Sequence, residues 1–163
     1  MVCELYRIKQ IMEKLLILGA GQYGMVVKQI AQVAGWTEIA FLDDNSDLAI
    51  GRLDDIENLK YDSAVVAIGN ANVREKLMER ISKNATLIHP QAVVMGSVGE
   101  GSIVEPGAVV YGKVGRGCII MSNVVVGHDA VVGDYCQIKY GSVIAERAIV
   151  PDKTKVDINK VWK

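Results

Sequence analysis

The chain has 163 residues, of which 50% are hydrophobic, enough for one ordinary domain or two very small ones. Its net charge of -1 gives no electrostatic case for binding nucleic acid or an acidic membrane, and no apolar run approaches the roughly 20 residues of a spanning helix. No signal-peptide pattern opens it, and its three cysteines fit neither a metal site nor a disulfide framework. We therefore expect a cytoplasmic protein without a metal.

Residues 1–12 stand apart from the rest of the chain, because "MEKLLILGAG" reads as a natural start at Met12. We expect these residues to form a peripheral N-terminal extension. The first predicted element after them is the apolar run over 15–18, which is typical of a buried strand.

A glycine-rich turn follows this strand and matches G-x-G-x-x-G in full, at Gly19, Gly21 and Gly24. A helical pattern over 25–34 comes next and ends at Gly35, which suits a C-cap. Glycines let the backbone approach a phosphate, and the N-terminus of a helix favours its negative charge. The turn therefore predicts a phosphate-bearing ligand; a tight strand-to-helix turn without any ligand is the alternative.

Two further predicted strands end in polar residues. "TEIAFLDD" ends at Asp43 and Asp44, about 20 residues after the turn, where carboxylates could accept hydrogen bonds from a ribose or a base. "YDSAVVAIGN" ends at Gly69 and Asn70, before the amphipathic helical pattern "ANVREKLMERI". The order β-α-β-β-α predicts a small Rossmann-like α/β domain over residues 13–84. A two-halved dinucleotide fold does not fit in this length, so full NAD use is disfavoured.

From residue 85 to 163 the chain is dominated by a six-residue repeat of branched aliphatics. Its register runs through Val98, Val104 and Val110 and, after one four-residue step, through Val114, Ile120, Val126, Val132, Ile138, Ile144 and Val150. So short a period predicts a solenoid in which three hexads make one coil. We expect three to four coils between Ile88 and Val150, followed by a C-terminal tail.

Cys118 and Cys136 occupy the same position in hexads one coil apart. We therefore expect them to stack in adjacent coils, as reduced thiols that fill a narrow corner.

One of the two histidines, His128, lies two residues beyond the inward-facing Val126. The equivalent positions of other hexads carry mostly polar residues, namely Glu100, Pro106, Arg116, Ser122, Asp134, Tyr140 and Glu146. The position is therefore an outward corner, which disfavours a buried core histidine and leaves a catalytic or a plain solvated side chain. The other histidine, His89, reads as a boundary residue before Pro90.

The hexad pattern resembles the left-handed parallel β-helix of the hexapeptide-repeat transferases. With the α/β domain before it, the chain from about Lys14 onward resembles the family of sialic-acid O-acetyltransferases and UDP-4-amino-sugar N-acetyltransferases. The segments that carry the resemblance are "ILGAGQYG", "FLDD", "AIGNANVREKL", "LIHPQAVV" and "VVVGHDAVVGDY".

This resemblance implies an acetyl-CoA-dependent acetyltransferase, a homotrimer whose active site lies at a subunit interface. His128 would be the general base and Asp129 its orienting partner, while Glu146, one coil further on, is a second candidate for that role. A sugar nucleotide would be held by Gly19, Gly21, Tyr23, Gly24, Asp43, Asp44, Gly69 and Asn70. Acetyl-CoA would lie along the β-helix, at Gln137, Gly141 and Ser142.

The chain also departs from the family pattern. Relatives often carry histidines where this chain has Tyr23 and Gln137, and its β-helix looks about two coils short. The leading hypothesis is N-acetylation of a nucleotide-linked amino sugar. Two alternatives remain open: O-acetylation of a sialic-acid-like sugar, and a non-catalytic sugar-nucleotide-binding or scaffold protein.

Overall fold

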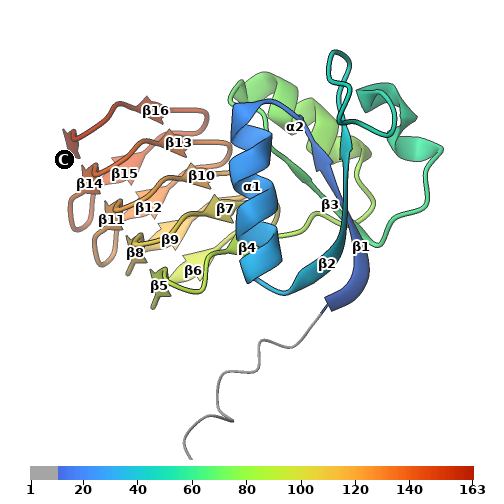
Figure 1. Ribbon diagram of the computed structural model, residues 1–163. Helices are drawn as coiled ribbons and strands as arrows, with labels where there is room; N and C mark the ends of the chain where they lie inside the picture. The colour runs from blue at the N-terminus through green and yellow to red at the C-terminus, as the bar shows by residue number, and fades with distance from the viewer. Residues whose placement is uncertain (1–10) are drawn as a thin grey trace, which may run out of the picture.

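The structure, a computed structural model, describes residues 11–163, which form a small α/β domain beside a parallel β-helix (Figure 1). The predicted N-terminal extension therefore lies largely outside the described residues. The first strand begins at Ile11, so residues 11 and 12 belong to this strand rather than to the extension.

The α/β domain is built around three parallel strands in the order β2-β1-β3. Its elements follow the predicted sequence, with one short 3-10 helix added: β1 (Ile11–Leu18), α1 (Gln22–Val33), β2 (Trp36–Leu42), η1 (Leu53–Glu57), β3 (Ser63–Val66) and α2 (Ala71–Arg80). The four residues of β3 and the second half of β1 are fully or almost fully buried, as their uninterrupted apolar runs predicted.

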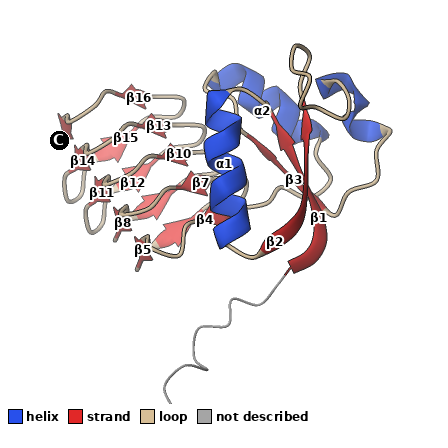
Figure 2. Cartoon of the chain, viewed as in Figure 1, coloured by secondary structure: helices blue, strands red, loops and turns tan. Residues whose placement is uncertain are grey.

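A helix packs on each face of this sheet, α1 on one face and α2 on the other (Figure 2). On one face, α1 packs Val27, Ile30 and Ala31 against Leu15 and Ile17. On the other face lie α2 and η1, with Leu77, Met78 and Ile56 against Leu16 and Leu18. The same two clusters continue into the β-helix through Leu87, Ile103 and Tyr135, so the two domains share their cores.

The β-helix has three parallel sheets, to which each coil adds one two-residue strand. The first sheet contains β4 (Leu87–Ile88), β7 (Ile103–Val104), β10 (Ile119–Ile120), β13 (Gln137–Ile138) and β16 (Lys155–Val156). The second contains β5 (Val93–Val94), β8 (Val109–Val110), β11 (Val125–Val126), β14 (Val143–Ile144) and β17 (Val161–Trp162). The third contains β6 (Ser97–Val98), β9 (Lys113–Val114), β12 (Val131–Val132) and β15 (Ile149–Val150).

The fold class inferred from the hexads is thus confirmed, and the anchor residues Val104 to Val150 form one buried core. The predicted tail differs from the structure. Residues 155–162 continue the helix as β16 and β17, because Val156 and Trp162 extend the six-residue register and pack against that core. The helix therefore has four coils and two sides of a fifth.

The stacking of the two cysteines is confirmed. Ile119 pairs with Gln137, so the residues before them, Cys118 and Cys136, face each other in adjacent coils, and both are fully buried free thiols. The neighbouring Cys136 thiol and burial raise the pKa of Cys118, which keeps it protonated.

No helix within residues 11–163 has the length and apolar character needed to cross a membrane.

Candidate active site

His128 lies at the corner between β11 and β12, and its side chain is 64% exposed. Its Nδ1 is 3.0 Å from Oδ2 of Asp129, and this contact lowers the pKa of the Asp129 carboxyl. A carboxylate at that distance holds the proton on Nδ1, which leaves Nε2 free to accept one. Among residues 11–163, no hydrogen bond joins the ring to Glu146.

Neighbouring residues of a straight strand point to opposite faces, so this pairing needs a special backbone. Asp129 has a φ of 59°, in the left-handed region that asparagine and aspartate tolerate better than most residues. The same conformation recurs at other corners of the helix, for example at Asn123, Tyr135 and Arg147. The hexad repeat thus imposes the turn that brings the carboxylate beside the imidazole.

The His128 corner is longer than the corresponding corners of the two preceding coils. The step from Val94 to Val98 spans four residues, as does the step from Val110 to Val114, whereas Val126 and Val132 are six apart. The strand registers agree, since Lys113 pairs with Ser97 below it and with Val131 above it. His128 and Asp129 are the two middle residues of the longer corner, so they extend beyond the shorter corners and remain accessible.

The glycine turn lies at the carboxyl ends of the three strands of the α/β domain. Gly19 has a φ of 106°, and a side chain on Gly24 would collide with the Gly19 carbonyl, so both positions require glycine for structural reasons. Gly21 is different, because no heavy atom lies within 4 Å of where its Cβ would be. It is the N-cap of α1, whose first turn has neither a side-chain cap nor an acidic residue. This end of α1 is therefore open to an anion.

The two aspartates after β2 already hold the loops around this turn. Asp43 accepts hydrogen bonds from the amides of Ala20 and Asn45, both at 2.8 Å, which lower the pKa of its carboxyl. Asp44 accepts one from the amide of Leu53 at 3.1 Å and is partly exposed. Asp43 thus fixes the glycine turn against β2, while Asp44 retains exposed oxygen surface.

Tyr23, expected in the sugar contact, points toward the β-helix instead. Its hydroxyl is buried without a hydrogen-bond partner among the described residues. Burial, followed by the nearby Glu105 carboxyl, raises its pKa well above the usual value. Glu105 is itself only 2% exposed, and its Oε2 accepts hydrogen bonds from the amide and hydroxyl of Ser122.

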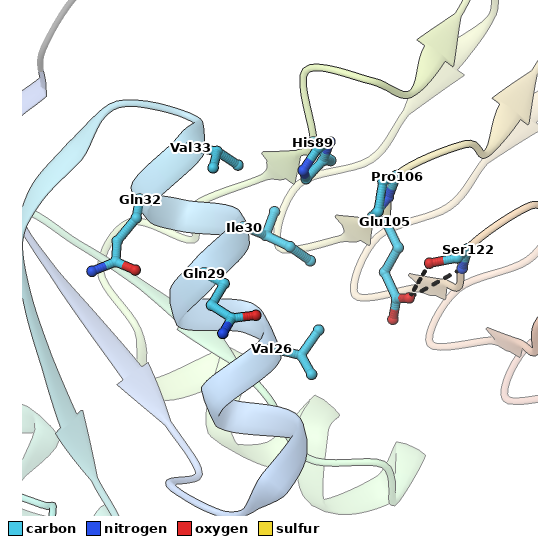
Figure 3. Close-up of a pocket in the computed structure, with 9 residues that line it drawn as sticks. All are labelled: Val26, Gln29, Ile30, Gln32, Val33, His89, Glu105, Pro106 and Ser122. Carbon is cyan, nitrogen blue, oxygen red and sulfur yellow. Dashed lines mark hydrogen bonds between the residues drawn. The ribbon is translucent and has the colours of Figure 1, made fainter.

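This buried carboxyl group borders a cavity of about 430 Å³ between α1 and the β-helix. Figure 3 shows Val26 and Ile30 of α1 on one side of it, with Glu105, Ser122 and His89 on the other. The predicted boundary residue His89 is thus a wall of this cavity, and its Nδ1 accepts a hydrogen bond from the amide of Gln91.

The three residues expected along acetyl-CoA lie in different environments. Gln137 points outward from the first sheet, beside Gly69 and Asn70, in a second cavity. Gly141 lies at a corner with a φ of 66°. Ser142 is fully buried, and its hydroxyl donates to the carbonyl of Asp157 at 2.6 Å. Of these three, Gln137 presents a side chain that a ligand can reach.

One chain does not bring the glycine turn and His128 together. The α/β domain covers the first sheet, where Leu87, Ile103 and Ile119 are buried. His128 lies at the corner between the other two sheets, on the opposite side of the triangular coil. A site that uses both would need a second copy of the chain.

Sequence reasoning missed Arg74, which joins the two domains. It is 1% exposed and donates three hydrogen bonds of 2.6–2.7 Å to the carbonyls of Gly117, Ile68 and Tyr135. No carboxylate within the described chain pairs with it, and burial lowers its pKa. An arginine among the charged residues of "ANVREKLMERI" reads as solvated, so no local signal could have identified it.

Two family models match the chain. The PglD N-terminal domain matches residues 14–81, and the bacterial transferase hexapeptide, a model of six repeats, matches residues 111–146. In this order, the chain carries a PglD-type N-terminal domain followed by bacterial transferase hexapeptide repeats. The family resemblance stated from the sequence is thereby confirmed.

Several solved structures share this architecture over nearly their whole length. The acetyltransferase domain of PglB from Neisseria gonorrhoeae is 23% identical, with a TM-score of 0.56, covering 90% of this chain and 92% of that one. PerB from Caulobacter crescentus, in complex with CoA and GDP-perosamine, is 20% identical, with a TM-score of 0.52, covering 94% and 93%. WeeI from Acinetobacter baumannii is 18% identical, with a TM-score of 0.56, covering 88% and 93%. At identities this low, the structural similarity establishes the fold alone.

Proposed function

We propose that the protein transfers an acetyl group from acetyl-CoA to the amine of a nucleotide-linked sugar, with His128 as the general base. The observation that carries this proposal is the exposed His128–Asp129 pair, 3.0 Å apart, on a hexapeptide β-helix. The open helix end at Gly21 supports a nucleotide as the carrier of the sugar. The similar fold of the perosamine N-acetyltransferase from Caulobacter crescentus favours nitrogen over oxygen as the acceptor atom.

In this mechanism the amine nitrogen attacks the thioester carbonyl and loses a proton to Nε2 of His128. The carbon–sulfur bond then breaks, and the departing thiolate takes that proton back, so the histidine ends unchanged. Asp129 keeps the ring in the required tautomer and stabilises the imidazolium that forms in between. No covalent bond to the protein is needed.

The direct test is to incubate the purified protein with acetyl-CoA and a panel of amino-sugar nucleotides, including GDP-perosamine and UDP-linked 4-amino sugars. Release of free thiol, with an acetylated sugar nucleotide detected by mass spectrometry, is the expected result. If no member of the panel releases thiol above the rate without protein, the proposal is wrong.

We expect the protein to be a homotrimer in solution. The second sheet presents an outward row of valines in register: Val93, Val109, Val125, Val143 and Val161. An apolar face of this kind is stabilised by burial against another copy, and in the proposed trimer a neighbouring copy supplies the His128 that acts on the nucleotide domain. Sedimentation at micromolar concentration should give the mass of three chains, and a clean monomer would contradict a shared active site.

Replacing Gly21 with valine should abolish binding of the sugar nucleotide while leaving the fold intact. The added side chain meets no protein atom, but it occupies the space above the open N-terminus of α1, where a phosphate would approach. Calorimetry with UDP and GDP measures the loss, and circular dichroism measures the fold.

A matched control for this variant is Gly24→Ala, in the same turn. Its side chain would collide with the Gly19 carbonyl, so it should lower the thermal midpoint, which Gly21→Val should not do. Unchanged nucleotide affinity in Gly21→Val would mean that the turn has only a structural role.

A further inference from the structure

A second cavity of about 320 Å³ lies where α2 meets the last coils of the β-helix, and we call it the junction pocket. The α/β domain contributes Gly69, Asn70 and Asn72 to its wall, and the β-helix contributes Gln137, Lys153 and Lys155. Its volume is at the lower end of the roughly 300 to 1,000 Å³ that small-molecule sites span, so this pocket suits one end of a nucleotide better than all of it.

The pocket is polar because the outward-facing residues that lie in register across the first sheet change from apolar to polar between its third and fourth strands. The outward residues of its first three strands, Leu87, Ile103 and Ile119, are apolar and buried beside the α/β domain. The next two in register, Gln137 and Lys155, are polar, and they line the pocket where that domain ends. Lys155 lies on the exposed side of its strand, directly next to Gln137 in the neighbouring coil.

Positive charge dominates the wall, because no aspartate or glutamate is among the described residues that line it. Within residues 11–163, Lys155 has no carboxylate at ion-pair distance. Lys153 forms an ion pair with Glu75, whose Oε2 lies 2.7 Å from the lysine Nζ. The buried guanidinium of Arg74 also borders the pocket and is paired with carbonyls alone.

The N-terminus of α2 does not supply the binding groups. The side chain of Asn70 already accepts hydrogen bonds from the amides of Asn72 and Val73, at 3.0 and 3.1 Å. An anion in the pocket must therefore be held by side chains, with Lys155 as the free cation and the amides of Asn72 and Gln137 as neutral donors.

We infer that the junction pocket binds a phosphate group, with Lys155 as its principal cationic partner. The identity of the molecule that carries this phosphate rests on the proposed function. In that function both substrates carry phosphates, the diphosphate of the sugar nucleotide and the phosphates of acetyl-CoA. Gly69 follows Ile68, whose side chain is beside Gly19, so the pocket adjoins the glycine turn and is within reach of a nucleotide placed there.

The first experiment uses inorganic phosphate as the probe and follows backbone amide resonances of the whole protein. Phosphate should shift the signals of Asn72, Gln137 and Lys155, and these shifts should be lost in Lys155→Gln and weakened by salt. The matched control is Lys160→Gln, an exposed lysine of the same last coil that lies outside the pocket; its shifts should equal those of the wild type. Shifts that are absent, or that persist in Lys155→Gln, would overturn the inference.

The second experiment measures affinities of GDP, UDP, CoA and 3′-dephospho-CoA for the wild type and for Lys155→Gln. Loss of a charge-assisted contact should lower the affinity for the ligand that makes it by about tenfold. A loss for the nucleoside diphosphates assigns the pocket to the acceptor, and a loss for CoA but not dephospho-CoA assigns it to the donor. If no affinity changes, the inference is wrong.

Failure of this inference can be distinguished from failure of the proposed function. The phosphate titration does not depend on acetyl transfer, so a loss of the shifts in Lys155→Gln would support the site even if no amino sugar were acetylated. Conversely, a protein that transfers acetyl groups at the same rate, with the same substrate affinities, in Lys155→Gln would retain its proposed function and lose this inference.

Discussion

Replacing His128 with alanine should reduce acetyl transfer by roughly 100- to 10,000-fold, the usual cost of removing a positioned general base. The fold should survive, because the side chain is 64% exposed and packs little, so the free energy of unfolding should change by less than about 1 kcal/mol. Thiol release under single-turnover conditions measures the first quantity, and urea unfolding measures the second. Affinity for CoA should be unchanged.

Two further variants identify the partner of the imidazole. Asp129→Asn should cost less than His128→Ala, because it disturbs the tautomer and orientation of a ring that is still present. Glu146→Gln should have little effect, since in the described chain the ring pairs with Asp129. A larger loss in Glu146→Gln than in Asp129→Asn would assign the role to Glu146. Equal activity of His128→Ala and the wild type would make His128 an ordinary surface residue.

Replacing Arg74 with methionine should destabilise the protein by about 3–5 kcal/mol. The change leaves the carbonyls of Gly117, Ile68 and Tyr135 without their donors in a buried site, and each unsatisfied group costs roughly 1–3 kcal/mol. Two of these carbonyls belong to the β-helix, so the contact between the domains should weaken first. Calorimetry should show the thermal midpoint falling by about 10 °C.

The control for this change lies on the same helix. Arg80 pairs with Asp54 and Glu57 at the surface, both at 2.9 Å, and exposed pairs of this kind contribute about 0–1 kcal/mol. Arg80→Met should therefore shift the midpoint by only a few degrees. If the two variants are equally stable, the hydrogen bonds of Arg74 do not hold the domains together.

The regular parts of the molecule could be predicted from local patterns. Hexad spacing determines which residues stack, so the core anchors and the pairing of Cys118 with Cys136 follow from counting alone. The strand, glycine turn and helix of the first domain were likewise readable, since period and turn chemistry are properties of short segments. The predicted end of the β-helix was wrong by one partial coil. Val156 continues the six-residue register, but the next anchor, Trp162, is not one of the branched aliphatic residues by which the repeat was recognised.

Other features depended on contacts between residues far apart in the chain. Arg74 is buried by hydrogen bonds that span 43 and 61 residues, which no local pattern encodes. The Tyr23 hydroxyl is buried because the β-helix packs beside it. The junction pocket brings Asn70 next to Lys155 for the same reason.

The sequence by itself therefore determined the two domains, their order, the coil register and the outward position of His128. The tertiary structure alone decided which side chains meet where those domains touch. Periodicity specifies neighbours at fixed separations along one element, whereas the docking of two elements is set by the shapes and charges of surfaces assembled from many of them.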